Sequence, residues 1–265
     1  MKKLFLFILL TCNLTNAQDF SDSWEGLFSF TTIVDIEESA TSVYAASENA
    51  VFIYDLSSRT FTTLTTINGL SGDEISQIHY SEDKSLLVIG YENGLLQIVD
   101  QDGEVIDVVA IKDKQVIPPD NKRINEFKES GDLIYIATDF GIAIYNLSRL
   151  EFDDTYFIGD NGAQIEISSI EIYQDFLYAA TSSSGVRRAS ITDPFLIDFM
   201  NWSQINGSLF SEVTSFNSQL FGLSLSRQVF QLGTANFQPT ATTINAVAID
   251  AHTSDVFFTV ATPNA

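Results

Sequence analysis

The sequence predicts an all-β protein, and within that class a β-propeller built from four-stranded blades. An apolar strand that ends in a small or polar residue occurs six times, with ends at Ser47, Tyr91, Thr138, Thr181, Ser224 and Ala261. The spacings between these ends, 37 to 47 residues, are typical of one propeller blade per repeat. No stretch has a convincing 3.6-residue apolar period, and the many Phe and Tyr residues favour pleated sheet over helix.

Each repeat contains four segments with the patterns of successive strands. The innermost strand alternates apolar and polar residues, and we expect it at 75–80, 124–127, 167–173, 213–216 and 244–250. The second is almost entirely apolar, as a strand buried on both faces should be, at 42–47, 86–91, 133–138, 177–181, 220–224 and 256–261. The third is expected at 50–56, 94–100, 141–147, 185–191 and 227–233. The fourth is more polar, as an outer edge strand should be, at 60–67, 104–111, 153–158, 199–205 and 236–244.

These repeats predict about five complete blades and a partial sixth in one domain, residues 18–265. Residues 112–123 contain two adjacent prolines, which cannot join a strand ladder, so we expect a loop between blades two and three. Residues 24–30 look like an outer strand without a blade of its own, which would pair with the last blade. Because Ala265 falls inside blade six, we expect the sequence to be part of a longer protein. The alternative is an irregular ring of five to six blades that the N-terminal strand completes.

Residues 1–17 are predicted to be a secretory signal peptide. Lys2 and Lys3 precede a short apolar run, Leu4 to Leu10, that is too short to span a bilayer. Cys12, the only cysteine, lies inside this segment, so the mature chain would lack disulfides and thiolate sites. A lipoprotein signal ending at Cys12 is the alternative, and it is less favoured because Thr11 is bulky for that cleavage.

The charge of the chain excludes several classes of partner. Lys and Arg number 13 against 35 Asp and Glu, a net charge of −22. So acidic a protein is not expected to bind nucleic acid or to adhere to anionic lipid in general. Beyond the signal peptide no apolar run is long enough to span a membrane.

No arrangement of residues predicts catalysis, a metal site or a cofactor. His79 and His252 are the only histidines, and neither has a partner at the spacing of a metal site or a catalytic triad. We therefore expect both to have packing roles. Asp100 to Glu104 resembles the start of a calcium loop but lacks the distal acidic ligand, so a hairpin turn is expected. The sequence thus predicts a protein that is not an enzyme.

The few basic residues are the candidate ligand contacts. Two clusters stand out, and their candidate anion-binding residues are Lys112, Lys114, Lys122 and Arg123 in the insert and Arg187 and Arg188 in blade four. In so acidic a chain they could receive an anionic sugar or a carboxylate. The alternative, which we favour, is that they pair with local Asp and Glu residues.

The sequence resembles known propeller repeats. Gly69-Leu70-Ser71, Ile75, Ile78, Gly90, Asn93-Gly94-Leu95 and Asp100 resemble the two-component regulator propeller repeat, in a degenerate form. Together with the signal peptide and the Trp24 strand, the repeats resemble the N-terminal propeller of PorZ-type proteins of the Bacteroidetes type IX secretion system. This resemblance covers essentially the whole chain, although no single invariant motif carries it.

The resemblance implies a fold and a function. Members of the family are longer proteins with two seven-bladed propellers and a C-terminal β-sandwich. It implies a non-catalytic component of the cell surface or outer membrane. This component would belong to a complex, with a separate sortase and outer-membrane partners, that attaches secreted cargo to anionic lipopolysaccharide. The resemblance also implies that the component binds this lipopolysaccharide. The alternatives are a periplasmic oligosaccharide-sensing propeller of a hybrid two-component regulator and, less favoured, a propeller lyase or glycosidase.

Overall fold

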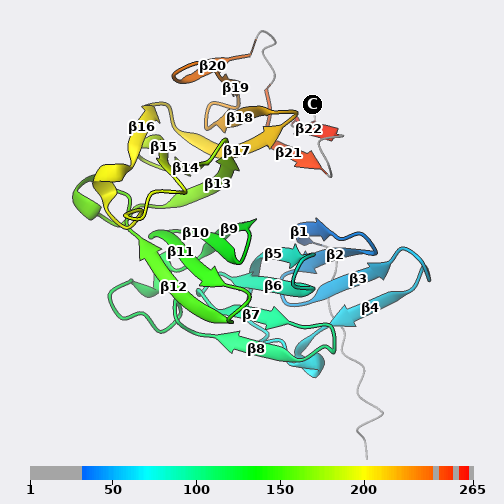
Figure 1. Ribbon diagram of the computed structural model, residues 1–265. Helices are drawn as coiled ribbons and strands as arrows, with labels where there is room; N and C mark the ends of the chain where they lie inside the picture. Colours follow the sequence, from blue (N-terminus) through cyan, green and yellow to red (C-terminus); the bar gives the residue numbers. More distant parts are fainter. Residues whose placement is uncertain (1–31, 241–244, 253–256, 263–265) are drawn as a thin grey trace, which may run out of the picture.

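The strands form five four-stranded antiparallel sheets and one two-stranded sheet (Figure 1). This computed structural model describes residues 32–240, 245–252 and 257–262. Strand order within each sheet follows the chain, from the centre of the propeller outward. The prediction of five complete blades and a partial sixth is confirmed. The signal peptide, the strand expected at 24–30 and Ala265 lie outside the described residues.

The strand bounds repeat closely from blade to blade. Blade one consists of β1 (Ile33–Glu38), β2 (Ser42–Ser47), β3 (Val51–Asp55) and β4 (Phe61–Leu64). Blade two consists of β5 (Ile75–Ser81), β6 (Leu86–Tyr91), β7 (Leu96–Val99) and β8 (Val105–Val108). Blade three consists of β9 (Ile124–Ser130), β10 (Leu133–Thr138), β11 (Gly141–Asn146) and β12 (Glu151–Tyr156). Blade four consists of β13 (Ile167–Tyr173), β14 (Phe176–Thr181), β15 (Gly185–Ser190) and β16 (Ser203–Asn206). Blade five consists of β17 (Phe210–Phe216), β18 (Gln219–Ser224), β19 (Val229–Leu232) and β20 (Phe237–Pro239), and blade six of β21 (Ala248–His252) and β22 (Phe257–Ala261).

The blades follow one another around a common centre. Each inner strand contacts the inner strand of the next blade, in the order β1, β5, β9, β13, β17 and β21. The series comes round until β21 faces β1 across the centre (Figure 1). Apolar side chains fill the space between neighbouring sheets, for example Val88 and Leu96 of blade two against Ile124 and Ile136 of blade three. The core therefore consists of interfaces between blades, which explains why the second strands are almost entirely buried.

A buried hydroxyl group closes most of the hairpins between the second and third strands. Thr138 Oγ1 donates to the carbonyl of Gly141 at 2.8 Å, and Thr181 Oγ1 donates to Gly185 at 2.8 Å. Ser47 and Ser224 make the equivalent bond in blades one and five. This contact gives a physical reason for the small polar residue that ends the repeated strand in the sequence.

One local expectation is wrong. Residues 199–201, expected to begin the outer strand of blade four, form a short 3-10 turn, because Asp198 caps it by accepting a hydrogen bond from the Met200 N–H at 3.0 Å. The 112–123 insert is a loop as expected, and its Ile117 side chain is buried in the core between blades two and three. β1 is the inner strand of blade one, for which the sequence analysis gave no range.

Candidate functional site

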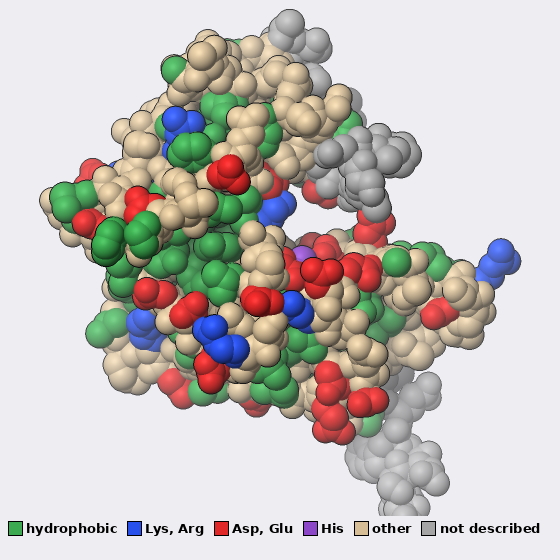
Figure 2. Space-filling model, viewed as in Figure 1, with side chains coloured by type: hydrophobic (Ala, Val, Ile, Leu, Met, Phe, Trp, Pro, Cys, Tyr) green, Lys and Arg blue, Asp and Glu red, His purple; other side chains and the backbone are tan. Residues whose placement is uncertain are grey.

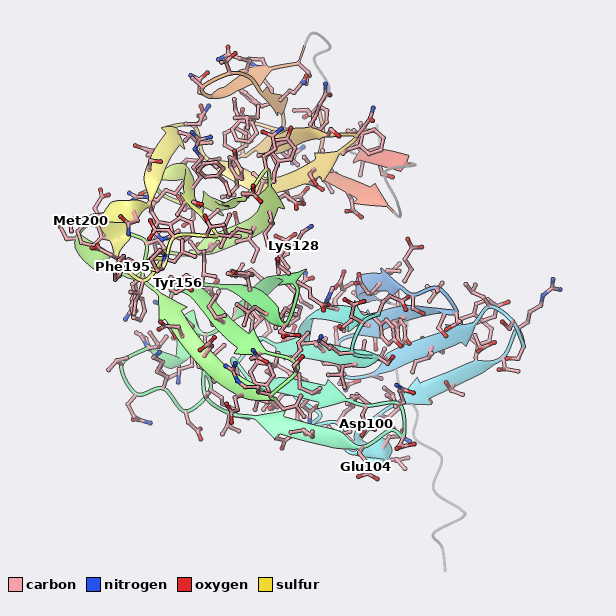
Figure 3. The ribbon with its side chains drawn as sticks, viewed as in Figure 1. Asp100, Glu104, Lys128, Tyr156, Phe195 and Met200 are labelled. Atoms are coloured by element: carbon pink, nitrogen blue, oxygen red, sulfur yellow. The ribbon has the colours of Figure 1, made fainter. Side chains whose placement is uncertain are left out.

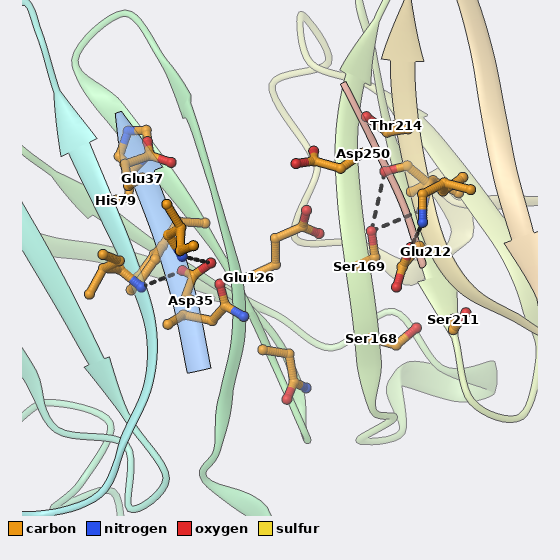
Figure 4. A pocket seen from close by; sticks show the side chains of 17 residues that line it. Asp35, Glu37, His79, Glu126, Ser168, Ser169, Ser211, Glu212, Thr214 and Asp250 are labelled. Carbon is orange, nitrogen blue, oxygen red and sulfur yellow. Dashed lines mark hydrogen bonds and ion pairs between the residues drawn. The ribbon is translucent and has the colours of Figure 1, made fainter. Parts of the chain in front are cut away.

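A polar cavity of about 380 Å³ lies at the centre of the blades (Figure 4). Residues from all six inner strands line it. Runs of consecutive residues, such as 35–37 of β1 and 77–79 of β5, contribute to the lining, so the inner edges of the blades form the wall. Their carboxyl and hydroxyl groups make this a strongly polar concave region, and we treat it as the candidate site. Acidic side chains and a histidine gather at its border in the space-filling view (Figure 2).

The third residue of each inner strand is polar, and in β1, β9, β13 and β17 it connects that strand to the next blade. Asp35 Oδ2 accepts the backbone N–H of Ile78 at 2.8 Å, across 43 residues of sequence. Equivalent bonds at 2.6 to 3.0 Å run from the Ile170 N–H to Glu126, from the Val213 N–H to Ser169 and from the Ile249 N–H to Glu212. These side chains therefore satisfy backbone donors that no strand ladder pairs.

Burial changes the acidity of these carboxyl groups. Removal from water raises the pKa of Asp35 to about 7 and the pKa of Glu126 to about 8. Burial also raises the pKa of Glu212. Around neutral pH the carboxyl groups of Asp35 and Glu126 are therefore substantially protonated, so the cavity carries less negative charge than its residue list suggests.

The fifth residues of the inner strands form a second layer of charged contacts. His79 Nδ1 lies 3.0 Å from Glu37 Oε1 of blade one, and His79 Nε2 lies 2.9 Å from Glu129 Oε2 of blade three. Burial lowers the pKa of His79, but the two carboxylates outweigh that effect and raise its pKa to about 9. A charged His79 thus joins three consecutive blades.

The same layer continues into blade four. Lys128 Nζ donates to Glu171 Oε2 at 2.9 Å, and Glu171 also accepts the backbone N–H of Ser215 in blade five at 3.2 Å. Lys128 is labelled at the centre of the molecule in Figure 3. Neighbouring blades are therefore held together by the ion pairs of His79 with Glu37 and Glu129 and by the pair of Lys128 with Glu171.

The chemistry that this arrangement supports is limited. The carboxyl groups with raised pKa values each accept a backbone N–H of the next strand, so they hold the blades in register and do not form an isolated acid and base pair. Within the described ranges no group of three or more His, Cys, Asp and Glu residues is arranged to hold a metal ion. The cavity has the size and polar lining for a small hydroxylated molecule.

The basic residues predicted in the insert all contact nearby groups. Lys112 Nζ donates to Asp73 at 3.0 Å, and Arg123 Nε lies 3.3 Å from Glu92. Lys114 Nζ donates to Thr155 Oγ1 and lies about 6 Å from two phenylalanine rings, and burial lowers its pKa. Lys122 is buried and donates to the carbonyl of Lys112. The insert therefore does not form one open basic surface.

The blade-four pair is also enclosed. Arg187 is buried and donates to the carbonyl of Ile158 at 2.9 Å and to the carboxylate of Asp160. The Arg188 guanidinium stacks 4.7 Å from the Phe176 ring and donates to the Tyr178 hydroxyl. Neither arginine reaches the central cavity or the insert residues. Anion binding by these six residues stays a prediction.

The inner-strand network is the feature that sequence reasoning missed. His79 was expected to pack without partners, but the fold brings Glu37 and Glu129 to it from 42 and 50 residues away. A signal was present, because the third and fifth residues of the inner strands are polar in nearly every repeat.

The expected turn at Asp100 is confirmed, since its carboxylate accepts the N–H groups of Asp102 and Glu104 between β7 and β8.

Comparison with solved structures identifies similar folds. PorZ of Porphyromonas gingivalis, described as an essential bacterial surface component of the type IX secretion system, is 20% identical with a TM-score of 0.71 and covers 85% of this chain. The extracellular domain assigned to a hybrid two-component system of B. thetaiotaomicron is 14% identical, with a TM-score of 0.55 and 86% coverage. Virginiamycin B lyase of Staphylococcus aureus is 14% identical, with a TM-score of 0.62, and the match covers 82% of this chain and 72% of the lyase.

These likenesses establish the propeller fold, and the same fold occurs in an enzyme. The chain spans 30% of the PorZ structure and 29% of the two-component domain. No curated protein sequence matches the chain. In the part of the chain that the structure covers, no helix has the length and apolar character to cross a membrane.

The sequence itself assigns the family. The family of PorZ N-terminal β-propeller domains, from the type IX secretion system, matches residues 43–203, more than half of the chain. The matched range runs from the second strand of blade one into the last strand of blade four, so it includes the inner strands β5, β9 and β13. This chain belongs to the family of PorZ N-terminal β-propeller domains.

Proposed function

We propose that this chain is a non-enzymatic scaffold of a type IX secretion and attachment complex at the cell surface. The family match over residues 43–203 carries the proposal. The inner-strand network supports the non-enzymatic part, since its carboxyl groups are bound to backbone donors of the neighbouring blades. Rigid blades of this kind can position partner proteins, including the sortase of the complex.

A deletion strain tests this role. Removal of the gene from a bacterium that carries it should leave cargo proteins exported but released into the medium, because the attachment complex lacks a component. Reintroduction of the full-length gene should restore cargo to the cell surface. Normal attachment of cargo in the deletion strain would overturn the proposal, and so would turnover of a glycan by the purified protein.

Binding of anionic lipopolysaccharide is the second part of the proposal. The side chains of Lys112 and Arg123 are 37% and 47% exposed, and each pairs with a single carboxylate. A phosphate group could share or replace that carboxylate partner. The double variant Lys112→Ala/Arg123→Ala should weaken binding of the purified protein to immobilised lipopolysaccharide. Lys84→Ala, which removes a comparable pair with Asp132, is the matched control and should bind normally. Equal binding by the two variants would exclude these contacts.

The alternative function is oligosaccharide sensing in the periplasm as part of a hybrid two-component regulator. The likeness to the extracellular domain from B. thetaiotaomicron and the polar lining of the central cavity favour it. The family match favours the attachment complex over this alternative. The rest of the gene distinguishes them, because a sensor requires a membrane-spanning helix and a kinase domain, and an attachment component requires neither.

A further inference from the structure

The loop between β15 and β16 exposes three large apolar side chains close together in sequence. Phe195, Ile197 and Met200 are 65%, 56% and 73% exposed. Phe195 and Met200 lie on a projection at the outer edge of blade four (Figure 3). Single exposed apolar residues are common, but three in one short loop indicate a surface that another molecule covers.

Hydrogen bonds hold this loop in its exposed form. The Asp193 carboxylate accepts the Phe195 N–H at 2.8 Å, and the Asn201 side chain donates to the Phe195 carbonyl at 2.9 Å. Trp202, itself buried, donates its indole N–H to the carbonyl of buried Leu196 at 2.9 Å. The apolar side chains therefore point outward from a braced loop, and such preorganisation lowers the entropic cost of binding a partner.

The loop adjoins a segment that also contacts the insert between blades two and three. A β-carbon placed on Gly162 would lie 3.6 Å from the Phe199 ring, so the turn at 160–162 packs against the loop. Two residues further on, Gln164 donates to the carbonyl of Val116 at 3.2 Å. Val116, in the insert, is 68% exposed. We define Phe195, Ile197 and Met200 as the apolar patch.

The charges next to the apolar patch are acidic. Asp193 and Asp198 belong to the loop, and Asp160, in the adjoining turn, is largely exposed and pairs with Arg187. The only basic residues of blade four, Arg187 and Arg188, are engaged in the interior and on aromatic rings. A second copy would bring the same acidic rim and a net charge of −22, and an anionic membrane would also be repelled.

We propose that the apolar patch is a docking surface for a partner protein that presents an apolar surface bordered by Lys and Arg. This deepens the proposed function as a scaffold of a multiprotein complex, and rests on it. The aspartates would select the partner and increase its association rate, and the apolar side chains would supply most of the binding energy.

Photo-crosslinking of the full-length protein in its own bacterium tests the patch. Met200 would be replaced by benzoylphenylalanine, with Ile67, which is 72% exposed on blade one, as the control position. Sequencing of the adduct should identify a protein segment that is apolar and net basic, and the adduct should be absent at position 67. Adducts to a second copy, to lipid or to an acidic segment would overturn the proposal, as would no adduct above the control.

Isosteric removal of the acidic charge supplies a second test. Asp193→Asn/Asp198→Asn keeps both oxygen acceptors of the loop and removes two charges. The adduct yield at position 200 should fall about threefold or more, since charge pairs change association rates. Asp55→Asn/Asp100→Asn, at two other turn carboxylates, is the matched control and should not change the yield.

Equal yields from the charge variant and its control would overturn the charge part of the proposal. The deletion strain described above separates this inference from the proposed function. If deletion releases cargo while the patch produces no specific adduct, the inference fails and the proposed function stands. If deletion leaves cargo attached, the proposed function itself fails.

Discussion

Glu126 provides the sharpest test of the inner-strand network, through the change Glu126→Gln. The Glu126 carboxyl accepts the Ile170 N–H at 2.6 Å, and the glutamine carbonyl can accept the same bond. The substitution therefore keeps the contact between blades three and four and removes only the ionisable group. Any change in the pH dependence of stability then comes from the titration of Glu126.

Burial raises the pKa of Glu126 from 4.5 to about 8. Between these values the folded protein keeps a proton that the unfolded chain releases, so the free energy of unfolding falls as pH rises. The full window corresponds to about 5 kcal/mol at about 1.4 kcal/mol per pH unit. The Glu126 side chain is only partly buried, so the surrounding water screens its charge. We therefore expect the difference in unfolding free energy to be about 2–3 kcal/mol.

Urea denaturation at pH 5 and at pH 8.5 measures the effect. The wild-type protein should lose more stability between the two pH values than Glu126→Gln, by about 2–3 kcal/mol. Glu104→Gln, at an exposed position in the turn after β7, is the matched control and should behave as the wild type. An identical pH dependence for wild type and Glu126→Gln would refute the reasoning.

Three further predictions test other contacts. His79→Gln should destabilise the protein at pH 6 by about 1–3 kcal/mol in urea denaturation. Because the pKa of His79 rises from 6.5 to about 9, this cost should be complete below about pH 6.5 and disappear above pH 9. Gly90→Ala would place a β-carbon 2.7 Å from Ile124 and 2.8 Å from Phe127, so the melting temperature should fall by the equivalent of about 1–3 kcal/mol. Thr138→Val removes the hydroxyl that closes the hairpin of blade three. The free energy of local opening, measured by hydrogen exchange of the amides in that hairpin, should fall by about 1–2 kcal/mol.

Each of these predictions has a contrary outcome. A cost of His79→Gln that is the same at pH 6 and pH 10 would show that its charge does not join the blades. An unchanged melting temperature for Gly90→Ala would mean that blade three moves away from the new methyl group at no cost. Faster exchange throughout the protein after Thr138→Val would indicate a general loss of stability and not a local role.

The fold could be predicted from the sequence because each blade repeats the same physical requirements. The second strands are buried on both faces between neighbouring blades, which requires a continuous apolar run such as Leu133 to Thr138. Outer strands such as Glu151–Tyr156 lie at the edge of the blade and contain more polar residues. The 3-10 turn at 199–201 was missed because Asp198 caps it locally, and strand periodicity carries no information about such a cap.

The site could be predicted far less well, because its contacts join residues of different blades. Asp35 and Ile78, or His79 and Glu129, lie more than 40 residues apart, and only the packing of the blades brings them together. The basic residues attracted attention because they are rare, yet Arg187 and Lys122 are buried in local contacts. The rarity of basic residues in the composition does not show which of them are exposed and which are buried in the fold.

We propose that the carboxyl groups of Asp35, Glu126 and Glu212 hold the blades together and take no part in a reaction. A full-length gene with Asp35→Asn, Glu126→Gln and Glu212→Gln, which keep the acceptors for the neighbouring N–H groups, would be placed in the deletion strain. The measurement is the ratio of cell-attached to released cargo at equal surface levels of the protein. We predict the wild-type ratio. A ratio as low as that of the deletion strain, with the folded variant present on the surface, would contradict the claim.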